Sequence, residues 1–292
     1  MTGGPRRLFC FGLGFSARVL AARLQAKGWS IAGTTRNPEA AAALTAVGID
    51  SFLFDRGRPL DDARAALSGA THILISVPPD VEGDSAADHH GRHIAAARPA
   101  WLGYLSTTGV YGDRDGGWVD EDSALEPTGG RGRRRVAAEA SWQALARAHD
   151  LPLHIFRLAG IYGPGRNAIV SLRAGTAQRI DKPGQVFSRV HVADIATVLE
   201  ASMTRPQPGR IYNVCDDDPA PPAEVIAYAS TLLGRAPPPL VPFAEAKLSD
   251  MARSFYRDSK RVRNDRIKSE LGIRLAYPDY KSGLKALLAE EG

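Results

Sequence analysis

Short apolar runs alternate with longer amphipathic or alanine-rich stretches through the first half of the chain. Residues 8–11 are apolar without polar alternation and stop at a glycine, which predicts a buried strand. Residues 19–24 then carry apolar side chains at helical spacing. The same alternation predicts further strands over 29–37, 51–54, 71–77, 101–105 and 153–158, and helices over 39–47, 60–67 and 80–100.

Strands that are separated by helices indicate an α/β fold with right-handed crossovers. We therefore expect a Rossmann-type, doubly wound parallel sheet. Later helices, predicted over 167–176, 194–203 and 222–233, follow loops that are punctuated by proline. These later segments predict a smaller C-terminal lobe that is interleaved with the sheet.

A glycine motif, Gly12-x-Gly14-x-x-Ala17, lies between the first strand and the first helix. In this context Gly12 permits the tight turn, Gly14 lets a pyrophosphate approach the backbone, and Ala17 allows the helix to pack on the strand. Backbone N–H groups and the helix dipole favour an anion here, so Phe15 and Ser16 join the predicted cofactor site. The alternative is a glycine-rich turn without a ligand.

The end of the second strand indicates which dinucleotide is bound. An Asp or Glu that would hold the ribose 2′-hydroxyl of NAD is absent, and Thr35 is followed by Arg36. A guanidinium offers planar donors to a 2′-phosphate, whereas a carboxylate would repel it. We therefore expect NADP(H), with NAD(H) less favoured. The alternative for Arg36 is an ordinary surface arginine.

Residues after the third and fourth strands complete the predicted cofactor site. Ligands of such sheets lie beyond the carboxyl ends of the strands, which directs Asp55, Ser76 and Val77 to the adenosine half. For Asp55 the alternative is a helix N-cap or a loop carboxylate.

The composition is that of a soluble globular protein, with 44% apolar and 24% charged residues among 292. No apolar run approaches the ~20 residues of a membrane span, and residues 1–7 lead directly into the first strand, so neither a membrane segment nor a signal peptide is expected.

Cys10 and Cys215 are too few for a disulfide framework and favour a reducing cytoplasm. The net charge of +5 fits a polyanionic cofactor or substrate; nucleic acid is the alternative, but no recognition motif accompanies it.

Three histidines gather in the segment 80–100. His89 and His93 could share a helix face, as metal ligands do, but the zinc-protease Glu and a Cys partner are absent. We interpret this segment as a solvated helix without a metal site.

The fifth strand ends in Ser-Thr-Thr-Gly-Val-Tyr-Gly, residues 106–112. Here the chain resembles the extended short-chain dehydrogenase/reductases, the NAD(P)-dependent epimerase/dehydratase family, and in particular an atypical branch of it. In that family the fifth strand ends in a Ser/Thr-rich run that closes with Val-Tyr-Gly. Further similar segments follow in the family's order at 157–165, 189–195, 211–214 and 277–284, so the resemblance covers nearly the whole length.

The resemblance implies that Thr107 hydrogen-bonds the reacting carbonyl or alcohol oxygen, which a hydroxyl can do as that oxygen gains charge. Dehydratase members of the family follow this Thr with an acidic pair. Thr108 and Gly109 stand there instead, so sugar-nucleotide dehydration of that kind is not expected.

The chain departs from the family at the Tyr and Lys that stand eight and four residues before a Glu. Counting back from Glu139 places Arg131 and Arg135 at these positions. A guanidinium stays protonated, so Arg131 cannot carry a proton, whereas Arg135 could hold the nicotinamide ribose. Either Tyr111 carries the proton, or the usual chemistry is absent. The alternative for this arginine-rich stretch is a solvated, basic helix start.

By this resemblance residues 1–160 and 190–215 form the NADP-binding domain, and 161–189 and 216–292 form the substrate-binding lobe. Arg131, Arg189 and His191 are the expected substrate residues. The expected activity is that of an NADP-dependent oxidoreductase or epimerase acting on a carbonyl or carbinol, including nucleotide-sugar-like compounds. The alternative is a catalytically degenerate NADP(H)-binding sensor. Relatives often pair through the fourth and fifth helices, so the resemblance also suggests a homodimer.

Overall fold

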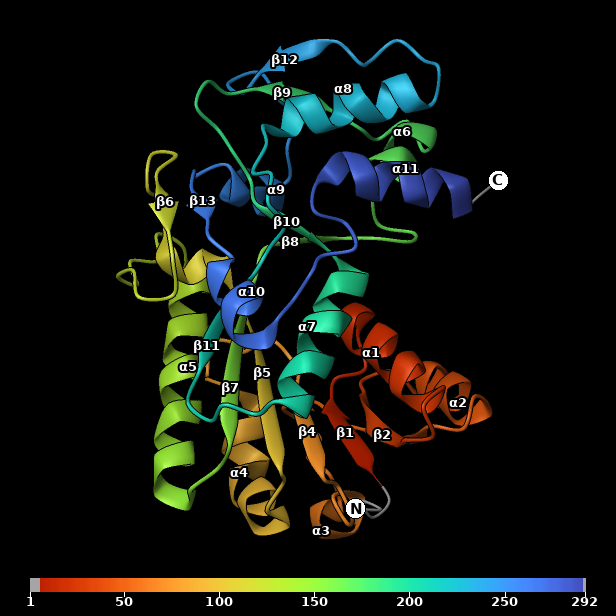
Figure 1. Ribbon diagram of the computed structural model, residues 1–292, viewed down its shortest axis with the longest axis vertical. Helices are drawn as coiled ribbons and strands as arrows, with labels where there is room; N and C mark the ends of the chain where they lie inside the picture. The colour runs from red at the N-terminus through yellow and green to blue at the C-terminus, as the bar shows by residue number, and fades with distance from the viewer. Residues whose placement is uncertain (1–5, 291–292) are drawn as a thin grey trace. The chain divides into compact units, whose positions relative to one another are not determined.

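The computed structural model describes residues 6–290, and its strands and helices alternate as the sequence predicts (Figure 1). Residues 1–5, which belong to the stretch in which no signal peptide is expected, lie outside the described residues. The first elements are β1 (Arg7–Phe11), α1 (Phe15–Gln25), β2 (Ser30–Thr35), α2 (Pro38–Ala46), β3 (Asp50–Leu53), α3 (Ala63–Ala66), β4 (His72–Ile75), α4 (Ser85–Ala97), β5 (Trp101–Thr107), the 3₁₀ turn η1 (Thr108–Tyr111), β6 (Trp118–Val119), α5 (Gly130–His149) and β7 (Leu153–Leu158).

The remaining elements are shorter strands and the helices of the C-terminal half. They are β8 (Gly160–Tyr162), α6 (Ala168–Arg173), β9 (Arg179–Asp181), β10 (Arg189–His191), α7 (Val192–Thr204), β11 (Ile211–Val214), α8 (Pro222–Leu232), β12 (Leu240–Pro242), α9 (Asp250–Phe255), β13 (Arg261–Val262), α10 (Asp265–Leu271) and α11 (Tyr280–Glu290). Within the described part of the chain, no helix is both long and apolar enough to cross a membrane.

The central sheet confirms the predicted Rossmann-type fold. Among residues 6–290 it contains seven strands in the order β11-β7-β5-β4-β1-β2-β3 (Figure 1). β1 lies between β2 and β4 and is parallel to both, with Leu8 beside Ile31 on one side and His72 on the other. Because the strands are parallel, their carboxyl ends meet at one edge, which is where ligands of such sheets bind.

Both faces of the sheet are buried, which explains why its strands are continuously apolar. Phe9 and Phe11 of β1 belong to a core cluster with residues of α3, α4 and α5. Side chains alternate along a strand, so Leu8 and Cys10 point to the other face. On that face α7 contacts β5 and α1: the indole of Trp101 donates to Ser202 at 3.0 Å, and Arg23 donates to Thr197 at 2.9 Å.

The chain divides into two compact units, which are interleaved along the sequence. The first unit contains the chain up to Ser106, Arg134–Arg157 and Ala196–Tyr212. The second contains Thr107–Arg133, Leu158–Ile195 and the chain from Asn213 onward. Residues 107–133, which the sequence assigns to the NADP-binding domain, thus belong to the second unit. The reason is that their backbone is bonded there: Ser259 accepts from Arg114 N–H at 3.0 Å, and Lys260 donates to Gly112 O at 2.6 Å.

The second unit is built on helices and short parallel strand pairs. Helices α6, α8 and α11 enclose a core that includes Tyr162, Ile169 and Leu284. The pairs are β8 with β10, β9 with β12, and β6 with β13, all parallel. The side chain of Asn167 caps α6 by accepting from Val170 N–H, and Pro222 starts α8 at a position where its missing N–H costs nothing.

Helix α4 corrects the interpretation of the histidine segment as solvated for His90, while His93 is exposed. His90 is only 2% exposed, and its ring stacks against Phe11 and lies beside Phe54. Its Nε2 accepts a hydrogen bond from Leu60 N–H at 3.1 Å. This burial lowers the pKa of His90 to about 4, so the residue is a neutral part of the core.

Candidate functional site

The turn between β1 and α1 is shaped by its neighbours in the sheet. Gly12 has φ of +90°, which other residues rarely adopt, and a Cβ on it would lie 2.9 Å from Val77 Cγ1. Its N–H donates to Thr34 Oγ1 at 2.8 Å. Packing against β4 and β2 therefore explains why position 12 must be glycine.

Gly14 has no such structural reason to be glycine. Its φ of −84° is ordinary, and a Cβ on it would meet no atom within 4 Å. Helix α1 begins at the next residue, and no side chain caps this end. Open space in front of an uncapped helix N-terminus suits a phosphate group. The residues present thus fit a pyrophosphate, which Gly14, Phe15 and Ser16 would hold through the backbone, since the Ser16 side chain is buried.

Thr35 and Arg36 end the second strand at the same edge of the sheet. Arg36 is exposed, and its guanidinium has no hydrogen-bond or ion-pair partner among residues 6–290. Thr35 Oγ1 accepts from Asn37 N–H at 3.4 Å, and the Asn37 side chain caps α2. The turn is thus held by Asn37, while Arg36 extends a positive charge that the protein does not neutralise.

Residues after β3 and β4 lie at this edge as well. Asp55 follows β3 and forms an ion pair with Arg58 at 3.3 Å. Ser76 and Val77 follow β4, and the N–H groups of both donate to Phe11 O, at 2.8 and 3.0 Å. The structure therefore brings together the predicted residues of the turn, of β2, of β3 and of β4 at the carboxyl edge of four adjacent strands.

Thr107 is the last residue of β5 and starts the 3₁₀ turn η1. Its Oγ1 accepts from Gly109 N–H at 3.1 Å, which caps the turn. The hydroxyl keeps its own hydrogen, so it can still donate to an oxygen of a bound molecule. Thr107 is partly buried, so its hydroxyl is held in place at the end of the strand.

Tyr111 is the proton carrier that the sequence offers in place of the family tyrosine. Its side chain is fully buried, and its hydroxyl donates to Asn213 Oδ1 at 2.7 Å. Burial and this bond favour a structural role for Tyr111.

Arg135 lies on α5 against the end of β5. Its Nη1 donates to Leu105 O at 2.7 Å and to the Tyr104 hydroxyl at 3.0 Å, and the guanidinium lies 5.6 Å from the centre of the Tyr104 ring. Arg131, one turn earlier, is exposed. The two residues that replace the family Tyr and Lys thus differ, since only Arg135 is fixed to the sheet.

A buried polar cluster next to Arg135 was missed by the sequence reasoning, which used Glu139 only as a point to count from. The Glu139 carboxylate accepts from Ser106 Oγ at 2.5 Å and from Arg157 Nη2 at 2.7 Å, and all three residues are buried. The cluster ties β5, α5 and β7 together. The charged Arg157 inside the apolar strand β7 was the available signal.

The two predicted substrate residues of β10 form hydrogen bonds with other residues of the protein. Arg189 Nη1 donates to Phe187 O at 2.8 Å and to Ala220 O at 3.0 Å, and burial lowers the pKa of Arg189. His191 is 4% exposed, and its Nδ1 accepts from Ala193 N–H at 3.2 Å. Burial leaves little of the His191 side chain open to a substrate.

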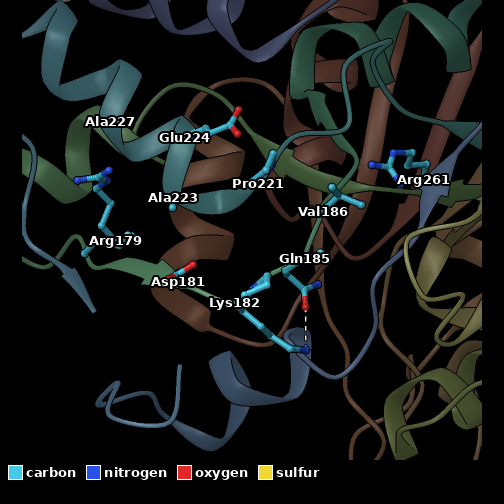
Figure 2. A pocket seen from close by; sticks show the side chains of 13 residues that line it. Arg179, Asp181, Lys182, Gln185, Val186, Pro221, Ala223, Glu224, Ala227 and Arg261 are labelled. Atoms are coloured by element: carbon cyan, nitrogen blue, oxygen red, sulfur yellow. Dashed lines mark hydrogen bonds between the residues drawn. The ribbon is translucent and has the colours of Figure 1, made fainter. Parts of the chain in front are cut away.

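A pocket of about 420 Å³ lies within the second unit, between β9, the start of α8 and β12 (Figure 2). Its charged lining includes Arg179, Lys182 and Arg261, with Asp181 and Glu224 opposing them. Lys182 Nζ donates to Gln185 Oε1 at 2.9 Å, as the dashed line in Figure 2 shows. The sequence could not reveal this pocket, because its walls come from segments that are far apart along the chain.

The chain is similar to several known proteins. A model of the NAD dependent epimerase/dehydratase family matches residues 92–215. Protein YeeZ of Escherichia coli K12 is 30% identical over 288 residues, which cover 94% of this chain and 97% of YeeZ. A solved structure of a functionally unknown conserved protein from Silicibacter pomeroyi is 55% identical, with a TM-score of 0.89 and coverage of 98% of this chain and 99% of that one.

A more distant likeness concerns the fold alone. The dTDP-glucose 4,6-dehydratase of Bacillus anthracis, solved in complex with NAD, is 16% identical and has a TM-score of 0.77. The similarity covers 98% of this chain and 97% of that chain.

Proposed function

Because this chain belongs to the NAD-dependent epimerase/dehydratase family, we propose that it is an NADP(H)-dependent oxidoreductase or epimerase acting on a carbonyl or carbinol substrate. The observation that carries the proposal is the pairing of two features at one edge of the sheet. Gly14 leaves open space at the N-terminus of α1, and Arg36 leaves an unneutralised positive charge at the end of β2. The first feature favours a pyrophosphate and the second a 2′-phosphate.

The bound cofactor would supply or accept a hydride, and the protein would bind it and orient the substrate. Gly14 and Ser16 would hold the pyrophosphate, and Arg36 the 2′-phosphate. Thr107 would donate its hydroxyl hydrogen to the substrate oxygen. Arg135 would hold the end of β5 in place, since it is bonded to Leu105 O.

The source of the proton differs from the family pattern. Tyr111 is buried and Arg131 stays protonated, so neither supplies it. Of the catalytic candidates from the sequence, Thr107 is the one whose hydroxyl is only partly buried. In this proposal the Thr107 hydroxyl relays a proton: it donates its hydrogen to the substrate oxygen and takes another from water.

Positive charge in the pocket of the second unit supports an anionic substrate. Arg179, Lys182 and Arg261 line that pocket and outnumber its two acidic residues, Asp181 and Glu224. Arg131 is a further exposed cation on the same unit. Nucleotide-sugar-like compounds carry the matching negative charge and a carbinol, so they are the first substrates to examine.

A second candidate function is an NADP(H)-binding sensor without turnover. The observation that favours it is the replacement of the family Tyr and Lys by Arg131 and Arg135, together with the bond that fixes the Tyr111 hydroxyl to Asn213. Such a protein would keep the cofactor edge of the sheet and lose proton transfer.

One experiment separates the two functions. The purified protein is titrated with NADPH and NADH, and then incubated with NADPH and a panel of aldehydes, ketones and nucleotide sugars while absorbance at the nicotinamide band is followed. The enzyme hypothesis expects preferential NADPH binding and steady oxidation with at least one compound. Tight NADPH binding without turnover over the whole panel would favour the sensor.

A further inference from the structure

The turn after β3 holds two opposite charges at the cofactor edge. Asp55 and Arg58 are joined by a pair of backbone hydrogen bonds, each 3.1 Å, in which each residue's N–H donates to the other's carbonyl. Their side chains also pair, with 3.3 Å between Arg58 Nη2 and Asp55 Oδ2. Both side chains are partly exposed, at 42% for Arg58 and 37% for Asp55. The two charges therefore lie at the surface of the edge where a cofactor is proposed to bind.

The same nitrogen of Arg58 reaches the end of the neighbouring strand. Arg58 Nη2 donates to Arg36 O at 3.0 Å. A single guanidinium thus links the turn after β3 to the residue after β2. Because β2 and β3 are adjacent and parallel, this link places Arg36, Asp55 and Arg58 next to one another.

The negative charge of Asp55 would weaken the binding of a 2′-phosphate at this edge. A carboxylate at this edge repels a phosphate dianion and can accept a hydrogen bond from a ribose 2′-hydroxyl, which would favour NAD(H). Arg58 offsets that charge, so the positive charge of Arg36 is left unopposed at this edge. The sequence identified Arg36 and Asp55 as cofactor residues but not Arg58, which contacts both of them.

We propose that Arg58 is a second specificity-determining residue, which neutralises Asp55 so that the edge formed by the ends of β2 and β3 accepts the 2′-phosphate of NADP(H). This inference rests on the proposed function. It adds that Arg36 alone does not set the choice of cofactor, because the net charge of the edge depends on the Asp55–Arg58 pair.

A purely structural role for Arg58 makes a different prediction. If Arg58 only ties the two turns together, then its loss weakens both dinucleotides alike, since both share the adenosine half. If it neutralises Asp55, its loss weakens NADPH selectively, and removal of the Asp55 charge compensates.

The test measures dissociation constants of NADPH and NADH by fluorescence titration or calorimetry, without any turnover. Arg58→Gln keeps a side-chain donor for Arg36 O but loses the charge, and Arg58→Ala loses both. Each is expected to raise the Kd of NADPH about fivefold and to leave the Kd of NADH within about twofold, as expected for one partly exposed charge contact. Asp55→Asn added to Arg58→Gln should return the Kd of NADPH to within about twofold of the parent.

Arg64→Ala is the control for loss of charge, because it removes one exposed positive charge from α3, which lies at the other edge of the sheet, where Arg7 of β1 donates to Ala66 O. Thermal unfolding of every variant checks the fold. An unchanged ratio of the two constants in Arg58→Gln, or a double variant that remains as weak as the single one, would overturn the proposal. If the parent itself shows no preference for NADPH, it is the proposed cofactor choice that fails, and this inference fails with it.

Discussion

Val77 Cγ1 lies 2.9 Å from the position that a Cβ on Gly12 would take. Gly14, only two residues along the same turn, has no atom within 4 Å of its own Cβ position. The two glycines of one motif are thus explained by different demands. Gly12 is required by the packing of the protein on itself, and Gly14 by the approach of a ligand.

A pair of variants separates these demands. Gly14→Val should keep the melting temperature close to that of the parent and reduce NADPH affinity by more than about tenfold, since a branched side chain would occupy the phosphate space. Gly12→Val should lower the melting temperature, because of both the clash and the positive φ. Thermal unfolding and cofactor titration measure the two effects. Unchanged affinity in a folded Gly14→Val would show that the phosphate does not bind at this turn.

Cofactor choice gives a second prediction, on Arg36. The parent should bind NADPH at least about tenfold more tightly than NADH, equivalent to ~1.4 kcal/mol. Arg36→Asp should abolish or reverse this preference, because a carboxylate repels the 2′-phosphate and can accept from the 2′-hydroxyl. Titrations with both cofactors test it, with Arg64→Ala as the control for loss of charge. Identical curves for NADPH and NADH with the parent would contradict it.

Substitutions of Thr107 and Tyr111 should differ in their effect on kcat. If the protein is an enzyme, Thr107→Ala should lower kcat by about 10²-fold or more, as for a lost donor to a charged oxygen, and Thr107→Ser should restore most of it. Tyr111→Phe should leave kcat nearly unchanged and cost about 1 kcal/mol of stability, since it removes one buried hydrogen bond to Asn213. Steady-state kinetics and urea unfolding make the comparison. A collapse of kcat in Tyr111→Phe would restore that tyrosine as a catalytic candidate.

The Glu139–Arg157 pair predicts a large and specific loss of stability. Glu139→Ala leaves a buried guanidinium without its carboxylate, and such losses cost about 3–5 kcal/mol. Glu39→Ala, at an exposed position on α2, is the control and should cost far less. Replacing both partners, Glu139→Leu with Arg157→Met, should recover most of the loss. Urea unfolding measures all of these, and a double variant no better than Glu139→Ala would show that the ion pair is not the cause.

Buried histidines give the chain a dependence on pH. Burial lowers the pKa of His90 to about 4, below the roughly 6.5 of an unfolded histidine. Between these values the unfolded state binds more protons, so the stability contributed by neutral His90 is present above pH ~6.5 and is lost as the pH falls toward 4. The difference in free energy of unfolding between the parent and His90→Gln should therefore shrink from pH 7 to pH 4.5. His149→Gln, at an exposed site, is the control; a difference that stays constant for His90→Gln would contradict the prediction.

The sequence predicted the fold well because its signals are local. Apolar strands such as residues 8–11, and the glycines that follow them, specify parallel strands and the turn at the cofactor edge without reference to distant segments. His90 was misjudged because its helix is rich in polar residues and the residues that bury it are distant in sequence: Phe11 ends β1, and Phe54 follows β3.

The candidate site was only partly predictable for a similar reason. The direction of the Tyr111 side chain depends on a single 3₁₀ turn and on Asn213, about a hundred residues later. The role proposed for Arg58 can be recognised only once β2 and β3 are known to be neighbouring strands. When the role of a side chain depends on contacts between distant segments, the sequence around that residue shows no pattern that predicts the role.

The interleaving of the two units has a consequence for synthesis. The chain passes from one unit to the other after Ser106, Arg133, Arg157, Ile195 and Tyr212. When β1 to β5 have left the ribosome, the sheet still lacks β7 and β11, and the strand edge at β5 stays unpaired until they arrive. Neither unit is a contiguous stretch of the chain, so neither can fold completely before parts of the other have been synthesised. The nascent chain must therefore keep an open, apolar edge protected until most of its length has been made, and no single cut would yield either unit as a free-standing fragment.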